Sequence, residues 1–491
     1  FALFIGTAPS QAGNPFKRQG RLLAEARAHG ELEYMVVDPA LNATASHASS
    51  ERNRWVPILP GTDTAFAMGL IQWLLNNNGY AADYLAIPSD HAAKAANEPG
   101  HSNSTHLVIE NDDHPRAGHF LRLSDLGLAE AESAADDLVV VSPAGELVAA
   151  DSLERAELFV SREVDTPNGT ILVKSSLTKL KEAADAHSME DYAKECGIPV
   201  ERIVEIAQKF AEHGRKSVAD CHGGMMSATG FYGAFAITAL NILAGSFNLR
   251  GGYIRGPAKF NGVTPGPRYD LTKFPGQRGP KGVFFSRSRF PYQKSSEFKR
   301  KQEAGQSPYP ARAPWRPLPA ALITEHLTSG LHGYPYPLKA IISHMANPIY
   351  GQAGLNNMIA DQLQDSSKIS LFVGIDGFIN ETNRYADYLV PDSVMYEVWG
   401  FAGSWSGTNT RLITSCWPVV EPRQQKTAEG EPVSMEAFLI AVSKRLGLPG
   451  FGSGAIQDAD GKPHDLNDAT DFFLRGLANI AYAGQPVPPA S

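Results

Sequence analysis

Short apolar runs alternate with helical patterns along the first 75 residues. Residues 1–5 are all apolar, and a loop rich in Gly, Pro, Ser and Asn follows them. From residue 18 to 29 apolar residues recur at helical spacing, and Gly30 is a typical residue after a helix end. This pattern predicts strands at 1–5, 34–37 and 55–59 and helices at 18–29 and 65–75.

The same alternation returns in the second half of the chain. It predicts strands at 217–219, 337–343 and 369–375 and helices at 231–243 and 355–363. Residues 138–148 read as a β-hairpin around a Pro-Ala-Gly turn, and residues 176–214 have a helical pattern. Strands that alternate with helices favour right-handed βαβ crossovers and parallel sheets.

The predicted fold class is therefore α/β. We expect two interleaved dinucleotide-binding domains with mostly parallel sheets and flanking helices, a small β-hairpin insertion, and a long irregular segment rich in Gly and Pro. The expected boundaries are 1–175 for the first domain and 176–449 for the second. The irregular insertion is 257–320, and the tail at 450–491 contains one helix, at 469–481.

Composition narrows the classes of function. A formal net charge of −8 argues against nucleic acid as a partner. The three cysteines lie too far apart to build an iron–sulfur or zinc site by themselves. The chain contains no run of eighteen apolar residues, so we do not expect it to insert into a membrane. Because the chain opens mid-strand without an initiator Met, we interpret it as a fragment, and the lack of a signal peptide carries no information.

Residues 268–316 hold 12 Lys or Arg against 3 Asp or Glu, a local excess of 9 positive charges. They could form an extended surface segment, or a basic wall that attracts anions.

Three loops at predicted strand ends are candidates for binding phosphate groups. They span residues 6–14, 220–227 and 346–354, and each is poor in bulky side chains, so that backbone N–H groups can approach an anion. None matches a dinucleotide fingerprint or a P-loop, so each could also be an ordinary βα turn. Cys221 beside His222 could suggest a nucleophile and its base, but a small buried Cys is the preferred interpretation.

Two aspartates follow the early strands. Asp38 ends the second strand, where α/β folds place an acid against a ribose hydroxyl. Asp63 follows Pro60-Gly61-Thr62 at the start of a helix. It could cap that helix, or its carboxylate could accept two hydrogen bonds from a guanine edge.

The most informative stretch runs from Asp376 to Pro391. Its pattern, Asp-x-Phe-x-x-Glu-Thr-x-x-Tyr-Ala-Asp-x-x-x-Pro, follows a buried strand. It resembles the molybdopterin oxidoreductases of the dimethyl-sulfoxide-reductase type. Residues 4–7, 36–39 and 55–63 resemble the family's first guanine-dinucleotide half-site, and residues 223–224, 243–245, 251–252 and 347–348 resemble its second.

The resemblance implies two molybdopterin guanine dinucleotides that hold molybdenum, or tungsten. The cofactor-binding residues that the loops, the strand ends and the resemblance together indicate are Gly6, Thr7, Asn14, Asp38, Gly61, Asp63, His222, Gly223, Gly224, Asn347, Asp376, Thr382 and Asp387. His222 is in addition a candidate for a residue on the substrate side. No metal ligand is assigned within the chain, because the family's metal ligand and its four-cysteine 4Fe–4S domain are expected before Phe1.

Residues 12–18 and 445–452 most resemble the family members that reduce tetrathionate. The expected function is therefore reduction of tetrathionate to thiosulfate in anaerobic respiration, on the periplasmic or exported face of the membrane. The expected partners are two further subunits, one with iron–sulfur clusters for electron transfer and one that anchors the complex in the membrane. Reduction of arsenate, polysulfide or thiosulfate remains open, as does a non-catalytic domain of the same fold in an electron-transfer complex. The fragment alone should not turn over.

Overall fold

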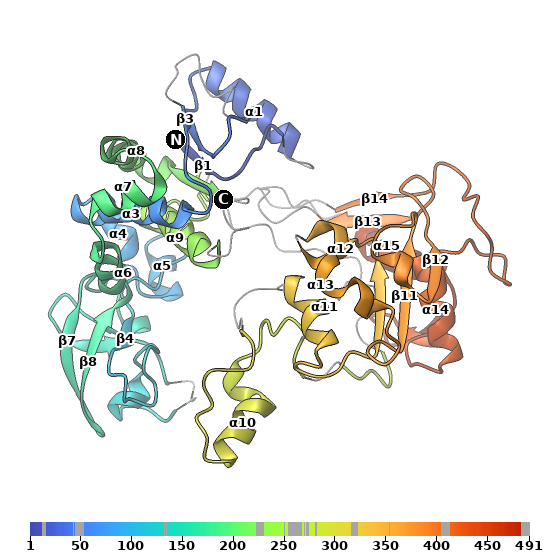
Figure 1. Ribbon diagram of the computed structural model, residues 1–491. Helices are drawn as coiled ribbons and strands as arrows, with labels where there is room; N and C mark the ends of the chain where they lie inside the picture. The colour runs from blue at the N-terminus through green and yellow to red at the C-terminus, as the bar shows by residue number, and fades with distance from the viewer. Residues whose placement is uncertain are drawn as a thin grey trace. The chain divides into compact units, whose positions relative to one another are not determined.

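The computed structural model describes residues 1–11, 16–42, 44, 54–131, 133, 135–221, 230–249, 251–253, 268–269, 271, 274–279, 282–315, 323–352, 354–403 and 413–482. It divides into two compact units, Phe1–Gly256 and Pro257–Ser491 (Figure 1). Each unit is built on a parallel sheet with helices on both faces, as the strand and helix alternation predicts.

The first unit contains a four-stranded parallel sheet with the strand order β3-β2-β1-β9. Its strands are β1 (Ala2–Ile5), β2 (Tyr34–Val37), β3 (Trp55–Val56) and β9 (Val218–Cys221). Ile5 pairs with Val37 on one side and with Cys221 on the other. Strand β9 therefore belongs to the first sheet, not to a second domain.

This pairing corrects the expected domain boundary at residue 175. Residues 176–256 lie in the first unit because β9 is hydrogen-bonded to β1 and the helices before and after β9 share one core with α3. The expected boundary came from the order of elements along the sequence, which does not show which strands are neighbours in a sheet.

Alternate residues of β1 and β2 face opposite layers of the first unit. Leu3 and Ile5 pack against α3 and α6–α9, whereas Phe4 packs with Leu23 of α1 on the other face. Helix α3 is apolar nearly all round because it lies inside this layer, between the neighbouring helices. The helices are α1 (Phe16–Ala28), α3 (Asp63–Asn76), α4 (Ala82–Leu85), α5 (Asp90–Ala95), α6 (Ser176–Asp185), α7 (Met189–Cys196), α8 (Val200–His213) and α9 (Gly230–Leu243).

Two small antiparallel sheets lie between α5 and α6 in sequence. The pair β5 (Val139–Val141) and β6 (Leu147–Ala149) is the predicted hairpin. The sheet β4-β8-β7 was not predicted. Its strands are β4 (Leu107–Ile109), β7 (Ser161–Thr166) and β8 (Gly169–Ser175), and β7 is polar and largely exposed, so that it lacks a hydrophobic alternation.

The second unit contains a three-stranded parallel sheet with the order β10-β11-β12. Phe372 of β11 packs against α11–α13 on one face, and Ile375 packs toward α14 on the other. The elements of this sheet layer are α11 (Ile323–Leu331), β10 (Ala340–His344), α12 (Pro348–Gly351), α13 (Leu355–Leu363), β11 (Leu371–Asp376), β12 (Tyr388–Pro391) and α14 (Met435–Arg445).

Two antiparallel pairs and a last helix complete the second unit. They are β13 (Gly400–Gly403) with β14 (Ile413–Cys416), β15 (Gly452–Gln457) with β16 (Pro463–Leu466), and α15 (Ala469–Tyr482). The helix was predicted, whereas the β15–β16 pair replaces an expected loop. Within the described ranges, no helix is long and apolar enough to cross a membrane.

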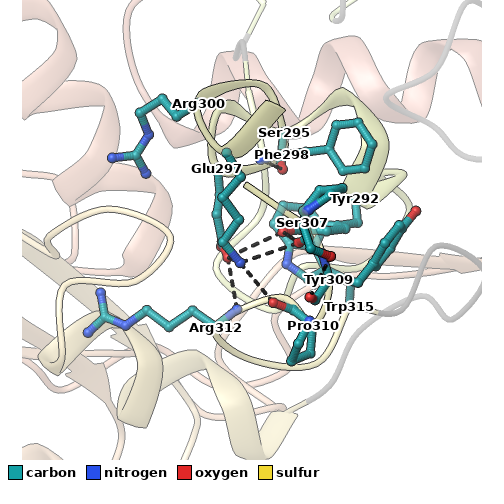
Figure 2. A network of polar contacts seen from close by, with 12 residues as sticks. Tyr292, Ser295, Glu297, Phe298, Arg300, Ser307, Tyr309, Pro310, Arg312 and Trp315 are labelled. Carbon is teal, nitrogen blue, oxygen red and sulfur yellow. Dashed lines mark hydrogen bonds and ion pairs between the residues drawn. The ribbon is translucent and has the colours of Figure 1, made fainter. Parts of the chain in front are cut away.

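The segment 257–320, expected to be irregular, contains an ordered cluster between residues 282 and 315. Helix α10 (Ser296–Glu303) places Glu297 among aromatic side chains, and Figure 2 shows Tyr292, Phe298, Tyr309 and Trp315 around it. We call residues 282–315 the α10 lobe.

A buried carboxylate holds the lobe together. Glu297 accepts hydrogen bonds from the Arg312 backbone N–H at 2.9 Å and the Tyr334 hydroxyl at 2.6 Å, and pairs with Lys301 at 2.9 Å. Arg287 is fully buried, and its guanidinium donates to the backbone oxygens of Pro314 and Phe285. Lys301 and Arg287 therefore stabilise the lobe and do not belong to an exposed basic wall.

Candidate functional site

The carboxyl edge of the first sheet collects the candidate residues of the first half-site. Ile5, Val37, Val56 and Cys221 end their strands side by side, because parallel strands in register finish at the same edge. Open α/β sheets bind ligands at this edge.

Gly6 and Thr7 begin the loop after β1. Gly6 has φ +58°, a left-handed conformation that favours glycine, while its N–H donates to the Val37 oxygen at 2.9 Å. Thr7 is buried. The loop therefore turns sharply at the sheet edge, with little side-chain bulk at the turn.

Asp38 directly follows β2 and has partners of its own. Its carboxylate accepts the Ala40 N–H at 2.9 Å and the Asn42 side-chain amide at 3.0 Å. A carboxylate offers about four acceptor positions, so these contacts leave capacity for a ligand hydroxyl.

The turn before α3 presents Asp63 to this edge. Leu59 to Thr62 form a β-turn in which the Thr62 N–H donates to the Leu59 oxygen at 3.3 Å. Gly61 takes φ +81° at the third position, as a type II turn requires, and it is exposed.

Asp63 is the first residue of α3 and not its cap. The N-cap position belongs to Thr62, which makes no side-chain capping bond. Asp63 is only 8% exposed, and across the described ranges its carboxylate has no hydrogen bond to another residue. Burial raises the pKa of Asp63, its own N–H opposes this, and the negative charge of Asp38 adds to the rise. The capping interpretation therefore loses its geometric basis.

Cys221 lies within electrostatic reach of Asp63. Burial raises the pKa of its thiol to about 12, with further contributions from Asp220 and Asp63. Because a thiol that stays protonated is a poor nucleophile, this site does not support a catalytic cysteine.

The carboxyl edge of the second sheet carries the second group of candidates. Asn347 follows β10, and its side-chain oxygen accepts the Thr382 hydroxyl at 2.9 Å. The same hydroxyl oxygen accepts the Ile349 N–H at 3.0 Å. Thr382 is 2% exposed, so it joins the loop after β10 to the loop after β11 from inside.

Asp376 ends β11, and a turn orders its carboxylate. One oxygen accepts the Phe378 N–H and the other accepts the Asn380 amide, both at 3.1 Å. Asp376 is half-buried, and its two remaining acceptor positions are available to a ligand.

Asp387 does not lie with this group. It precedes β12 at the opposite edge of the sheet, where its carboxylate accepts the Phe372 N–H at 2.7 Å. Phe372 stands four residues before Asp376, about 13 Å along a strand. Asp387 therefore stabilises the sheet, which corrects its prediction as a cofactor-binding residue.

Several polar partners at this edge were not predicted. Glu381 accepts the side-chain amide of Asn347, and Asn380 accepts the N–H groups of Thr382 and Asn383. His344, at the end of β10, contacts Asp392 at 2.8 Å across the end of β11. Their positions after strands were visible in the sequence, but their pairing depends on strand order. The predicted residues Asn14, His222, Gly223 and Gly224 lie outside the described residues.

Comparison with known proteins finds relatives over nearly the whole chain. The chain is 48% identical to a tetrathionate reductase subunit from Salmonella typhimurium, with 99% of this chain and 47% of that protein covered. The corresponding protein of Archaeoglobus fulgidus is 34% identical, with 94% of this chain and 41% of that protein covered. No family model matches the chain.

Along nearly its whole length the chain is similar to molybdopterin oxidoreductases of the dimethyl-sulfoxide-reductase type, which confirms the predicted resemblance. A selenate reductase subunit from Mesobacillus selenatarsenatis is 32% identical, with 98% of this chain and 44% of that protein covered. The chain thus spans about half the length of the relatives that it matches. Acetylene hydratase of Pelobacter acetylenicus has the same fold, with a TM-score of 0.52 at 16% identity over 91% of this chain and 47% of that one.

The family implies a molybdopterin cofactor with molybdenum. The residues at the first edge fit an extended anionic ligand with a nitrogenous base. Gly6 keeps the turn small, and Asp63 is a buried carboxylate that lacks a protein donor other than its own N–H among the described residues. A base that presents two adjacent N–H donors would supply what Asp63 lacks.

Proposed function

We propose that this chain is the cofactor-binding portion of a molybdenum oxidoreductase that reduces tetrathionate to thiosulfate. The reaction adds two electrons to the central S–S bond of one tetrathionate dianion and releases two thiosulfate dianions. The cofactor, as two molybdopterin guanine dinucleotides, supplies this two-electron chemistry when bound. The 48% identity over 99% of the chain supports the substrate assignment.

In this proposal the chain binds and orients the cofactor. Gly6 and Thr7 lie where a phosphate would approach the backbone, and Asp38 accepts from a ribose hydroxyl. The carboxylates of Asp63 and Asp376 each accept hydrogen bonds from the N–H groups of one guanine base. Asn347 and Thr382 hold the two loops of the second edge in place.

Asp63 is the observation that carries the proposal. Asp63 is 8% exposed and accepts no hydrogen bond from another residue in the described ranges, so two N–H donors of a ligand would offset the cost of burying its charge. A non-catalytic domain that has lost its cofactor would have no reason to retain this group.

The test is cofactor content in the full-length enzyme. Asp63→Asn replaces one acceptor oxygen by a donor that faces the guanine donors, and each lost charged hydrogen bond is worth roughly 1.5–3 kcal/mol. We expect bound molybdenum and released guanine nucleotide to fall together by at least about tenfold under limiting cofactor, since about 1.4 kcal/mol corresponds to tenfold in an equilibrium constant.

Asp113→Asn is the matched control, because Asp113 is an exposed carboxylate of the same unit. It should leave both contents unchanged. Equal cofactor content in the Asp63→Asn variant and in the parent would remove the guanine role of Asp63. Parent enzyme without guanine nucleotide would favour the non-catalytic alternative.

We further propose that the complete enzyme works on the exported face of the cytoplasmic membrane. Its partners in this proposal are an electron-transfer subunit with iron–sulfur clusters and a second subunit that anchors the complex in the membrane. The tetrathionate reductase relatives are named as single subunits of their enzymes, which supports a complex of several chains. Immunogold labelling and purification of the intact complex test these assignments.

A further inference from the structure

An apolar cavity lies along the free edge of the second sheet. Its volume is about 590 Å³, and its walls include Phe284, Leu327, Leu338 and three consecutive residues of β10, Ala340–Ile342. Successive residues of a strand point to opposite faces. A cavity that touches three in a row must therefore follow the edge of the strand.

Among the described residues, no strand is hydrogen-bonded to the outer edge of β10. The sheet order places β11 on one side of β10 and no strand on the other. Unpaired strand edges offer a row of backbone donors and acceptors that an extended peptide can use. Ile342 and Phe284 are each 57% exposed at this edge, so the apolar wall is accessible.

Two arginines shape the loop that closes the cavity. Arg287 and Arg289 both have positive φ, +52° and +55°, which is uncommon for residues other than glycine. Arg287 points inward, where its guanidinium holds Pro314, Phe285 and Ser329. Ser286 and Ser288 are each 1% exposed, and their hydroxyl oxygens lie 2.7 Å apart beside the cavity.

Arg289 points outward and lines the cavity. It is exposed and, within the described ranges, makes no hydrogen bond or ion pair. The buried Arg287 thus fixes a strained loop that presents one unpaired cation next to an apolar wall. Strain that is maintained by such a network often marks a binding site.

The surrounding charges favour an acidic partner. The exposed charged residues of the α10 lobe are Arg289, Lys294, Lys299, Arg300, Glu303 and Arg312, that is, five cations against one carboxylate. Figure 2 shows Arg300 extending away from the aromatic cluster. The whole chain carries −8 and residues 268–316 carry +9, so that the remainder carries −17. A positive surface on a negative body attracts an acidic chain and repels a basic one.

We propose that this edge is a docking site for an extended segment of another protein chain, with apolar residues flanked by Asp or Glu. The segment adds a strand beside β10, seats an apolar side chain in the cavity and pairs a carboxylate with Arg289. Backbone bonds give the affinity, and the cavity and Arg289 select the sequence.

Peptide binding to the full-length protein tests the site. The probes are three fluorescent peptides: acidic Asp-Val-Phe-Val-Asp, basic Lys-Val-Phe-Val-Lys, and Asp-Val-Pro-Val-Asp, whose proline removes a strand donor. The acidic peptide should bind at least tenfold more tightly than the other two. Absence of binding, or equal binding of the basic or proline peptide, overturns the proposal.

Arg289→Glu should weaken binding of the acidic peptide at least tenfold. Arg300→Glu makes the same charge change outside the cavity and should weaken that binding less than threefold. Arg289→Gly removes the charge and places a glycine at the positive φ. We therefore expect this variant to fold and to lose the preference for the acidic peptide over the basic one. If the Arg289 and Arg300 variants weaken binding equally, the peptide is held only by the general positive charge of the surface, and the proposed site is overturned.

A photo-crosslinking residue at Ile342 in the purified complex identifies the natural occupant. A cross-link to an acidic, apolar segment of a different chain supports the proposal. A cross-link within the same chain, or none, contradicts it. Neither readout uses enzyme activity, so failure here is distinct from failure of the proposed function.

Discussion

Replacing Glu297 by Gln should loosen the α10 lobe selectively. Glu297 is 9% exposed and accepts from the Tyr334 hydroxyl at 2.6 Å and the Arg312 N–H at 2.9 Å, with Lys301 at 2.9 Å. Glutamine keeps one acceptor oxygen, puts an N–H₂ group in place of the other, and leaves Lys301 without its counter-ion.

The magnitude follows from these contacts. Hydrogen bonds to a charged group contribute roughly 1.5–3 kcal/mol each. The Lys301 side chain is 27% exposed, so water compensates part of the lost ion pair. We expect a net loss of about 2–3 kcal/mol in the free energy of local opening, which raises the open population about 30- to 150-fold.

Limited tryptic digestion measures this opening. Lys299 and Arg300 lie within α10, whose helical backbone must open before cleavage, so the rate follows the open population when opening is fast. Glu303→Gln is the control, because Glu303 is exposed at the end of the same helix. Similar cleavage rates in the Glu297→Gln variant and in the control would refute the assigned role of the buried carboxylate.

The same carboxylate makes the lobe sensitive to acid. Burial opposes ionisation of Glu297, but bonds from Tyr334, Lys301 and Arg312 outweigh it and lower the pKa below the ordinary value of 4.5. Its contribution is therefore fully present above that value and disappears as pH falls through the folded-state pKa. Protection from an acid-active protease should decline over this range in the parent and much less in the Glu297→Gln variant.

Two further outcomes are expected. If the proposed function holds, neutralising Lys299 and Arg300 together in the full-length enzyme should raise the Michaelis constant for tetrathionate at low salt and change it little at high salt, because the screening length shortens to about 8 Å near 0.15 M. Equal Michaelis constants of variant and parent at every salt concentration would show that the lobe has no role in attracting the substrate. At pH 8, iodoacetamide should modify exposed Cys416 well before Cys221, whose pKa burial and two neighbouring aspartates raise to about 12; mapping of the alkylated peptides at early times checks this order.

Local pattern was sufficient for every strand of the first sheet and for β10 and β11 of the second, but it did not predict β12. Strand β2 and helix α13 have the predicted bounds, Tyr34–Val37 and Leu355–Leu363, because their apolar residues face the core without interruption. Elements with weak alternation were missed, such as the exposed strand β7 and the β15–β16 pair. Their stability comes from partners distant in sequence, which a local period does not report.

The sequence determined the candidate residues more fully than their roles. It located Asp63 after a Pro-Gly turn but left both a helix cap and a ligand acceptor open for that position, whereas in the structure Thr62 holds the N-cap position. Asp376 and Asp387 belong to one motif, yet they lie at opposite edges of the sheet, because a parallel crossover returns the chain to the starting edge.

By itself, the sequence determined the α/β class, the strand ends and the motif that identifies the family, since these depend on local periodicity and on residues close together in the chain. The tertiary structure decided which strands are neighbours, that β9 completes the first sheet, and that Arg287 is buried while Arg289 is exposed. Pairing, burial and charge compensation arise from contacts between distant segments, so only the folded chain could assign them.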